Sequence, residues 1–580
     1  MDFGLHLSRA PVLRRLPKTG SPLIKVKSQI GELISKTSLL LQTSEGSITT
    51  KQIDASSLTV KAINGDLNLG VISSDHSEIR TSDGSITSEK IQGQSVLARK
   101  TNGDIKIGEL TSKTSLLLQT SEGSITTRQI DASSLTVKAI NGDLNLGVIS
   151  SDHAEIRTSN NGNIDARQIQ SASVLVRSIN GNIKVDNITS SEVLTLQSSF
   201  GIIETSQIDA SSLIVKAVNG DLNLGVVSSG HAEIRTSNNG NIKVDNITSS
   251  EALTLQSSGG SITTNQINAS SLTVKAINGS LNLGVASSDH AEIRTSNNGN
   301  IDAQQIQGAS VSVRSTNGNI RVQDIASSEI LTLQSSDGSI ITNQIDASSL
   351  IARTVNGPMI LGLVAAGNDL EIRTSGGNIS ADRIEAELVS VKTTQGNMAI
   401  GLVSAMRQVD LQSSSGNISA EHLKGESVFA KTGRGSIILE NVATSREISL
   451  QTSEGNIIAE HLKGAFVTAK ATSKGDIETG LIEAHANVNL RNGDIQIGQI
   501  MGSLMLKSSN GDVKVGVEET QNIRIQAFNG DVALSAPEKF AATLDLAGKN
   551  LDLSGWGIVN PGTEPELKMA TRQGAPLIHV

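Results

Sequence analysis

The sequence predicts an all-β protein, namely a single-stranded parallel β-helix (β-solenoid) of about 26 rungs, each of roughly 18–20 residues, which we expect to be right-handed. Two observations carry this prediction. Glycines recur at a nearly constant spacing along most of the 580 residues, and apolar residues alternate with polar ones on both sides of each glycine. A third observation that agrees with this prediction is that aromatic residues make up only 1% of the chain.

The glycine spacing defines the rung. From Gly46 to Gly530, 26 glycines follow one another at intervals of roughly 18–20 residues, an internal period typical of solenoid proteins. A longer duplication lies above this period, since residues 36–82 and 113–159 differ at two positions only. The first eight turn glycines are Gly46, Gly65, Gly84, Gly103, Gly123, Gly142, Gly162 and Gly181.

Short strands flank each turn. Leu58 and Val60 alternate with polar residues before Gly65, and Leu67 and Leu69 alternate with polar residues after it. This period of two, rich in Val, Ile, Leu and Thr, is typical of β-strands. Two or three such strands with a corner make one coil, and coils of a β-solenoid stack about 4.8 Å apart.

Small residues are expected to point inward next to the turns. The position three residues before the glycine usually holds Ala, Ser or Thr, as at Ala62, Thr81, Thr120 and Ser159. The residue before the glycine is most often Asn, and Asn-Gly accepts a positive φ at low cost. We expect the side chains of these asparagines to form local hydrogen bonds that cap the turns. Examples are Asn102, Asn141, Asn161 and Asn180.

The composition excludes several kinds of site. The chain has no Cys and no Tyr, one Trp and six Phe, so disulfides, thiolate metal sites and Cys nucleophiles are excluded. A narrow core built from Val, Ile and Leu explains the shortage of aromatic residues. The net charge of −9 and the pI of about 5.6 argue against a nucleic-acid partner. The sequence holds no apolar run long enough for a transmembrane helix.

Three segments are predicted. Residues 26–535 form the repeat array, residues 1–25 form a basic tail or cap, and residues 536–580 form degenerate rungs and a cap. The head is rich in Arg and nearly free of acidic residues, which is similar to a mitochondrial presequence. An intracellular location is favoured, this head suggests a mitochondrial one, and a secreted or cell-surface location is the alternative.

One set of residues is a candidate metal site. Asp476, Asp494, Asp512 and Asp531 each follow the turn glycine in four consecutive rungs. Stacking in register would place these carboxylates in one column, where a calcium ion would relieve their mutual repulsion. The alternative is a solvated acidic edge without an ion. No other cofactor is expected.

The histidines are too far apart along the rungs to form a metal site. His76, His153, His231 and His290 lie three or four rungs apart, which is too far for the ligands of one metal ion. His422 and His461 lie two rungs apart, and the same objection applies.

The repeated phrases carry a resemblance to a known family. LTVKAINGDLNLG, VRSINGNIKVDNI and LQSSSGNISAEHL are similar to the adhesin-like β-strand-repeat domain of unknown function, which occurs in bacteria and in uncharacterised animal proteins. The resemblance covers roughly residues 30–535. Filamentous-haemagglutinin-type repeats are a second match. The family implies a β-helical fold and has no established catalytic residues that could be carried over.

The predicted function is a non-enzymatic, elongated and monomeric scaffold that binds or spaces protein or surface partners through its long faces. The alternative is a carbohydrate-active β-helix enzyme of the lyase or glycosidase type. Such an enzyme needs paired carboxylates in a groove and usually aromatic side chains that stack on sugars. A groove with two carboxylates beside an exposed aromatic residue would favour the enzyme.

Overall fold

The computed structural model describes residues 14–15, 23–25, 29–519, 522–535, 543–547, 551–552, 568–572 and 575–579. The chain divides into two compact units, Met1–Asp289 and His290–Val580, and each is described by itself. Most of the predicted head and of the predicted C-terminal cap lies outside the described residues, so the assignment of these two segments stays a prediction.

The first unit consists of strands, and the described residues contain no helix. Its strands are β1 (Arg14–Arg15), β2 (Leu23–Lys25), β3 (Gln29–Glu45), β4 (Ile48–Asn64), β5 (Leu67–Asp83), β6 (Ile86–Asn102), β7 (Ile105–Glu122), β8 (Ile125–Asn141), β9 (Leu144–Thr158), β10 (Ile164–Ser178), β11 (Ile183–Ser198), β12 (Ile203–Ala217), β13 (Leu222–Thr236), β14 (Ile242–Ser257) and β15 (Ile262–Ala276).

Strand β16 (Leu281–Thr295) begins in the first unit and ends in the second. The remaining strands are β17 (Ile301–Gly308), β18 (Ser310–Ser315), β19 (Ile320–Ser335), β20 (Ile340–Arg353), β21 (Met359–Ala366), β22 (Asp369–Arg373), β23 (Ile379–Thr393), β24 (Met398–Ser413), β25 (Ile418–Thr432), β26 (Ile437–Glu454), β27 (Ile457–Lys474), β28 (Ile477–Asn492), β29 (Ile495–Met501), β30 (Leu504–Asn510), β31 (Val513–Glu519), β32 (Asn522–Asn529), β33 (Val532–Ser535), β34 (Thr543–Ala547), β35 (Leu551–Asp552), β36 (Lys568–Arg572) and β37 (Ala575–His579).

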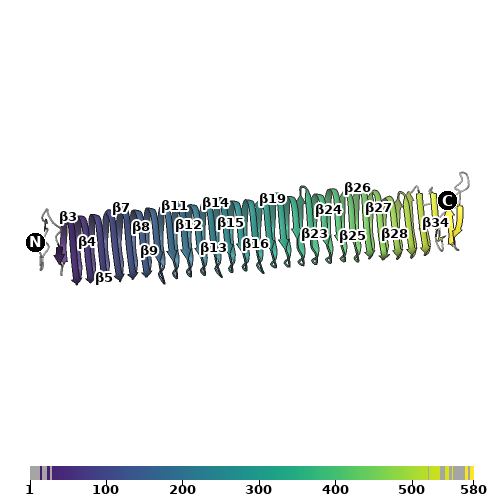
Figure 1. The fold of residues 1–580 in the computed structure, drawn as a ribbon. Helices are drawn as coiled ribbons and strands as arrows, with labels where there is room; N and C mark the ends of the chain where they lie inside the picture. Colours follow the sequence, from purple (N-terminus) through teal and green to yellow (C-terminus); the bar gives the residue numbers. More distant parts are fainter. Residues whose placement is uncertain are drawn as a thin grey trace. The chain divides into compact units, whose positions relative to one another are not determined.

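Each long strand is one coil of the chain and pairs in parallel with the next coil. Ile48 of β4 faces Leu67 of β5, which in turn faces Ile86 of β6. Figure 1 shows the long strands of each unit side by side in chain order. Within the described residues, the antiparallel pairs are β34 with β37 and β36 with β37. The predicted parallel β-solenoid of about 26 turns is confirmed.

The burial pattern shows how a coil bends around its core. In β4, buried residues alternate with exposed ones, and the alternation is broken where Lys51 and Gln52 are both exposed and again at Ser56 and Ser57. Such breaks place a corner between straight segments, because alternation persists only while the strand runs straight. The buried positions of this rung are Ile48, Thr50, Ile53, Ala55, Leu58, Val60 and Ala62.

The core consists of aliphatic side chains that stack on their own kind from rung to rung. The position of Ile53 is occupied by Ile72, Ile91 and Leu110 in the next three rungs, and all four are almost completely buried. Burying such a side chain stabilises a protein by about 1.5–3 kcal/mol. Because the contacts are made between adjacent coils, the stability of each unit is approximately a sum of contributions from its rungs and from their contacts with neighbouring rungs.

A hydroxyl group joins neighbouring turns at the inward position before most turn glycines. The amide of Gly435 donates to Thr432 Oγ1 at 3.2 Å, and this hydroxyl donates to the carbonyl of Gly416 in the preceding rung at 2.9 Å. Ser315 links Gly318 and Gly299 in the same way. The small residue predicted here therefore satisfies buried backbone groups as well as fitting the corner.

The predicted inward position is wrong by one residue in the Asn-Asn-Gly turns. Ser159 lies half-buried, and Thr158 takes the inward position and donates to the carbonyl of Gly162 at 2.7 Å. The reason is an extra residue in these turns. Asn160, Asn238 and Asn297 adopt φ values of 60°, 58° and 57°. Asn tolerates this left-handed conformation better than most residues.

The turn glycines are required by close packing more than by their own conformation. Gly65 has a φ of 150°, but Gly181 and Gly220 have no positive φ. A Cβ on either of these two would lie 1.9 Å from the carbonyl oxygen of the preceding turn glycine. The positive φ that Asn-Gly accepts therefore does not account for the glycines of the middle rungs, where the backbones of successive turns approach too closely for any side chain.

We therefore expect Gly377→Ala to destabilise its rung and Gly376→Ala to be tolerated. A Cβ on Gly377 would lie 2.0 Å from the carbonyl oxygen of Gly357, whereas a Cβ on Gly376 would meet its nearest neighbour, an Asn356 side-chain oxygen, at 3.4 Å. Such overpacking costs about 1–3 kcal/mol. Hydrogen exchange should show faster opening of β21 and β23 in the first variant only. Equal exchange in the two variants would contradict the role given to close packing.

Candidate functional site

The aspartate column predicted from the sequence exists in the second unit. Asp476, Asp494 and Asp512 each accept a hydrogen bond at Oδ1 from the backbone amide of the next aspartate, at 3.0, 2.8 and 2.9 Å. The amide of Asp476 donates to Asn456 Oδ1 at 2.9 Å. The carboxylates are thus brought together in consecutive rungs, and three of them are held by the backbone of the following rung.

The same ladder continues where the position after the turn glycine is not aspartate. The amide of Asn397 donates to Asn378 Oδ1, and the amide of Asn417 donates to Asn397 Oδ1. In the first unit, the Ser124 amide donates to Asp104 Oδ1 at 3.0 Å, and this bond is the main reason why the pKa of Asp104 is lowered. The primary role of the column is therefore to satisfy backbone amides at the turns.

A calcium ion in the aspartate column stays a prediction. Among the residues that the structure describes, no group of three or more His, Asp or Glu side chains is arranged to hold a metal ion. The aspartates use one carboxylate oxygen each for the backbone, and asparagine does the same in neighbouring rungs. The hydrogen bonds account for the column without an ion.

The asparagines before the glycines bond between rungs rather than within their own turn. Asn102 Nδ2 donates to Asp83 Oδ1 at 2.7 Å, and Asn180 Nδ2 donates to Asn161 Oδ1 at 3.4 Å. Asn141 Oδ1 accepts from Asn160 Nδ2 at 2.7 Å. The expectation of local capping was wrong for these side chains, because the neighbouring rung supplies a partner at each of these turns.

The histidines are not brought together. His76 Nδ1 lies 2.9 Å from Ser95 Oγ. His461 Nε2 lies 2.9 Å from Glu483 Oε1, and Lys463 Nζ donates to the other oxygen of Glu483 at 2.7 Å. The hydrogen bonds from Lys463 and from His461 hold the pKa of Glu483 below its ordinary value. This small network is an ion pair on the surface of β27 and β28.

One lysine departs from the inward pattern. Lys100 occupies the position that Thr81 and Thr120 hold in the adjacent rungs, and it is only 5% exposed. Its ammonium group donates to the carbonyl of Asn102. Burial lowers the pKa of Lys100, and the nearby carboxylates, first among them Asp66, oppose this effect in part. A buried cation in a slot suited to a hydroxyl is a local cost to the fold.

A groove follows one corner of the coils in the second unit. This open groove has a volume of about 1120 Å³. Each rung contributes two neighbouring residues to the floor of the groove, one that points outward and one small residue that points inward. Examples are Ser404 with Ala405 and Lys424 with Gly425. Its lining residues are Asp346, Ala365, Ala366, Gly367, Glu385, Ala386, Ser404, Ala405, Met406, Lys424, Gly425, Glu426, Ala443, Thr444, Ser445 and Lys463.

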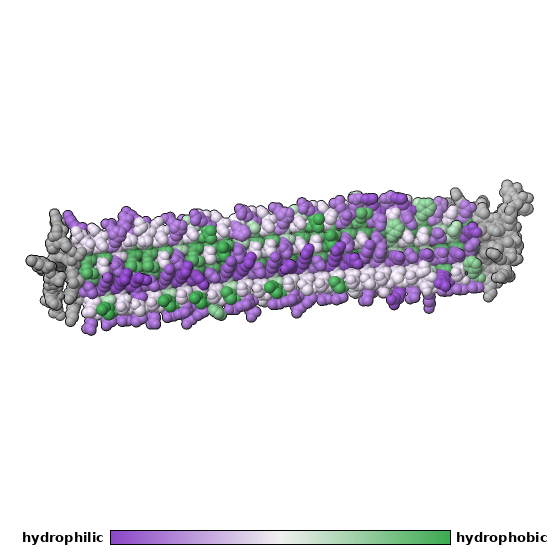
Figure 2. All heavy atoms as spheres, in the orientation of Figure 1, coloured by the Kyte–Doolittle hydropathy of each residue, from purple (hydrophilic) through white to green (hydrophobic). Residues whose placement is uncertain are grey.

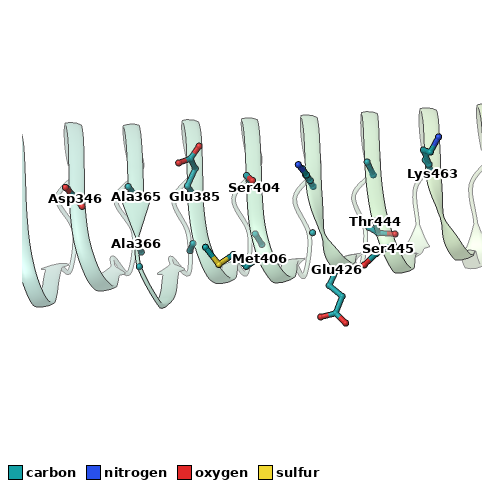
Figure 3. A pocket seen from close by; sticks show the side chains of 16 residues that line it. Asp346, Ala365, Ala366, Glu385, Ser404, Met406, Glu426, Thr444, Ser445 and Lys463 are labelled. Carbon is teal, nitrogen blue, oxygen red and sulfur yellow. The ribbon is translucent and has the colours of Figure 1, made fainter.

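An extra residue in alternate rungs forms one bank of this groove. The register of β24 against β25 shifts between Ser404 and Gln408, and that of β26 against β27 shifts after Ala443. Arg407 and Arg446, on these protruding segments, pair with Glu387 and Glu426 of the preceding rung at 3.3 and 3.1 Å. In Figure 3, Glu426 points away from the side on which Glu385 and Lys463 lie.

The groove does not favour a sugar-cleaving enzyme. Two of the three lining carboxylates are paired, Glu385 with Arg383 and Glu426 with Arg446, and no aromatic residue is among the lining residues. The matching groove in the first unit encloses about 680 Å³ along the same corner of β3 to β7, and its lining also lacks an aromatic residue. Neither groove therefore combines two carboxylates with an exposed aromatic residue in its lining.

A column of basic side chains is the feature that sequence reasoning missed. It lies outward on the straight segment before the turn, and its members face one another in successive rungs. In the first unit it runs through Gln42, Lys61, Arg80, Arg99, Gln119, Lys138, Arg157, Arg177, Gln197, Lys216, Arg235, Gln256 and Lys275.

In the second unit the column runs through Arg294, Arg314, Gln334, Arg353, Arg373, Lys392, Gln412, Lys431, Gln451, Lys470, Asn489, Lys507 and Gln526. We call the members of these two runs, taken together, the basic column. Seventeen of them are Lys or Arg and none is acidic, although the whole chain has a net charge of −9. Figure 2 shows a hydrophilic band along each unit with apolar side chains beside it.

The signal for the basic column was present in the sequence. Its members lie four residues before the turn glycine in most rungs, as Lys61 does before Gly65, and five residues before it in the Asn-Asn-Gly rungs, as Arg157 does before Gly162. Net charge averaged over the chain hides such a column. Aligning the rungs on their glycines and comparing the charge position by position would have revealed it.

Comparison with known proteins identifies the repeat. A family model described as Toastrack DUF4097 matches residues 15–154, 232–343, 341–442 and 426–553. No curated protein and no solved structure matches the chain. The expectation of a β-repeat domain of unknown function is thereby confirmed, and the adhesin-like and haemagglutinin-type resemblances stay predictions. In the part of the chain that the structure describes, there is no helix that is long and apolar enough to cross a membrane.

We expect Asp494→Asn to leave stability nearly unchanged, within about 0.5 kcal/mol, because the amide oxygen of Asn accepts the same backbone hydrogen bond. Asp494→Ala should cost about 1 kcal/mol, because the amide of Asp512 loses its partner. Thermal melting with and without calcium measures both. A calcium-dependent rise of the melting temperature in the native chain that Asp494→Asn abolishes would establish the ion and contradict a purely hydrogen-bonding role.

We expect Lys100→Thr to stabilise the chain by about 1 kcal/mol near neutral pH, because threonine fills this position in both adjacent rungs. The folded state lowers the pKa of Lys100, so the unfolded chain binds more protons between the folded pKa and the ordinary value of 10.5, and stability rises with pH in that window. The advantage of the variant should therefore shrink as the pH approaches about 10.

Thermal melting over this pH range tests the expectation, and Lys61→Thr, at an exposed position of the basic column, is the control. The exposed substitution should change stability by less than about 0.5 kcal/mol. A Lys100→Thr variant less stable than the native chain would show that the buried ammonium contributes more than it costs.

Proposed function

We propose that this chain, which belongs to the Toastrack family of domains of unknown function, is a non-enzymatic scaffold that binds or spaces partners through the outward faces of its coils. The single observation that supports this proposal is the register of the outward positions. In each unit, one side-chain position recurs at the same place on successive rungs, so that a partner can make the same contact many times.

The repetition has physical consequences for binding. Thirteen turn glycines fall in each unit, so each outward column extends on the order of 60 Å at about 4.8 Å per rung. A partner that is itself repetitive, or that carries several binding modules, gains affinity from many weak contacts without any single strong site. The outward columns are built on strands that are fixed by the core on one side, which keeps their spacing constant.

The enzyme alternative finds no specific observation in its favour. Two of the three carboxylates that line the groove in the second unit, Glu385 and Glu426, are each paired with an arginine, and aromatic residues are missing from the lining of both grooves. These observations favour the scaffold over the enzyme.

Photo-crosslinking from chosen rungs tests the scaffold. A photoreactive residue is placed in the full chain at Leu175 or Thr195, which are outward and opposite each other in adjacent rungs. Matched probes at Asp165 and Lys184 report a different face of the same two rungs. We expect both probes of one pair to capture the same partner, because a repeated face offers equivalent contacts in each rung.

Two results would contradict the proposal. One is capture from a single rung but not from its neighbour on the same face, which would indicate a local site. The other is turnover of a polysaccharide by the full chain, abolished by Glu385→Gln, which would establish the enzyme.

A further inference from the structure

The geometry points to the basic column as a binding strip for a linear acidic polysaccharide, whose carboxylate or sulfate groups recur along an extended chain. This inference rests on the scaffold function proposed above and names the chemistry of one partner. The net charge of the whole chain is negative and by itself gives no reason to expect an anionic partner.

The first argument is the spacing of the cations. Consecutive members such as Lys138, Arg157 and Arg177 lie directly opposite one another in adjacent rungs, about 4.8 Å apart. Nine of the thirteen members in the first unit and eight of the thirteen in the second are basic. An extended polymer that lies along the stacking direction can therefore meet a cation at most rungs.

The second argument is that the cations are only partly neutralised. Glutamates two residues before the column pair with some of them, as Glu155 does with Lys138 and Arg157 at 3.5 and 2.5 Å. Arg177, Arg373 and Lys431 form no ion pair with any described carboxylate. The side chains remain accessible, since those of Arg157 and Arg353 are 40% and 50% exposed.

The border of the strip carries little negative charge. In the first unit, the residues two positions before the column include three acidic residues, Glu78, Glu155 and Glu233, and those two positions after it include none. The column has nine basic residues in the same unit, so the strip has a net positive charge. Fixed cations in a row attract an anionic chain and raise its rate of association at low ionic strength.

The third argument is the chemistry of the side chains themselves. The guanidinium group of Arg presents paired N–H donors that match a carboxylate or sulfate. The other members are Gln and one Asn, whose amides donate to and accept from hydroxyl groups. A polysaccharide that carries both acidic groups and hydroxyls satisfies both kinds of side chain along one line.

In the first unit, the strip is less suited to a nucleic acid than to a polysaccharide. Single-stranded nucleic acids are held largely by bases that stack on aromatic side chains. In the first unit, no aromatic residue occupies the column or the positions two residues before or after it. Duplex DNA is read by elements that enter its grooves. The column lies on a sheet face whose side chains alternate in and out, and it offers no such element.

The experiment measures binding of labelled polygalacturonate to the full chain by fluorescence anisotropy at several salt concentrations. The test variant combines Lys138→Gln, Arg157→Gln and Arg177→Gln, which remove three consecutive cations. Glutamine occupies the same column in the adjacent rungs at Gln119 and Gln197, so the fold should tolerate it. The control combines Arg167→Gln, Lys184→Gln and Lys243→Gln, exposed residues on other faces.

We expect the native chain to bind polygalacturonate with an affinity that falls as salt rises. The column variant should bind about tenfold more weakly and show a shallower dependence on salt, because fewer counterions are released. The control variant should bind like the native chain. Circular dichroism and thermal melting establish that both variants are folded.

Three results would overturn the inference. They are no binding of polygalacturonate at low salt, an equal loss of affinity in the two variants, and column-dependent binding of an oligodeoxynucleotide in place of polygalacturonate. The third would assign the strip to a nucleic acid. Failure of this test leaves the scaffold proposal standing if the photo-crosslinking probes still capture one partner from adjacent rungs.

Discussion

The fold depends on the close approach of successive turns at their glycines. The carbonyl oxygen of one turn glycine lies where a Cβ of the next would be, as for Gly318 and Gly338, at 2.0 Å. This contact fixes the register of one coil on another. The register then aligns the aliphatic core, the hydroxyls beside the turns, and the Asp and Asn side chains after the turns that accept hydrogen bonds from the next rung. The outward columns follow from the same contact, so the proposed binding strip is a consequence of backbone packing.

The sequence was sufficient to predict the fold because the rung is short and strictly repeated. The alternation around Gly65 predicted the inward positions Leu58, Val60, Leu67 and Leu69, all of which are buried. The inward residue near Gly162 was misplaced because an inserted asparagine cannot be distinguished from a shift of the strand without the backbone. The sequence predicted that Asn-Gly accepts a positive φ. It could not predict the close contact between the glycines of successive turns, because that contact joins two rungs.

The candidate site was harder to predict because its chemistry arises between rungs. The aspartate column was found from its spacing, but the hydrogen bond from the Asp512 amide to Asp494 could not be, since it depends on the exact distance between coils. The basic column was overlooked for a different reason. Lys138 and Arg157 are separated by one full coil of the chain, and the relation between them appears only when the sequence is read once per coil.

The direction of the backbone hydrogen bonds has a mechanical consequence. In each unit they run between coils, along the stacking direction, so a pull along that direction loads the coils one after another. A coil that detaches would release about 19 residues, or roughly 60 Å of extended chain, while the next coil stays folded. A unit under tension would therefore lengthen in discrete steps of one coil and would limit the force transmitted between whatever is attached to its two ends.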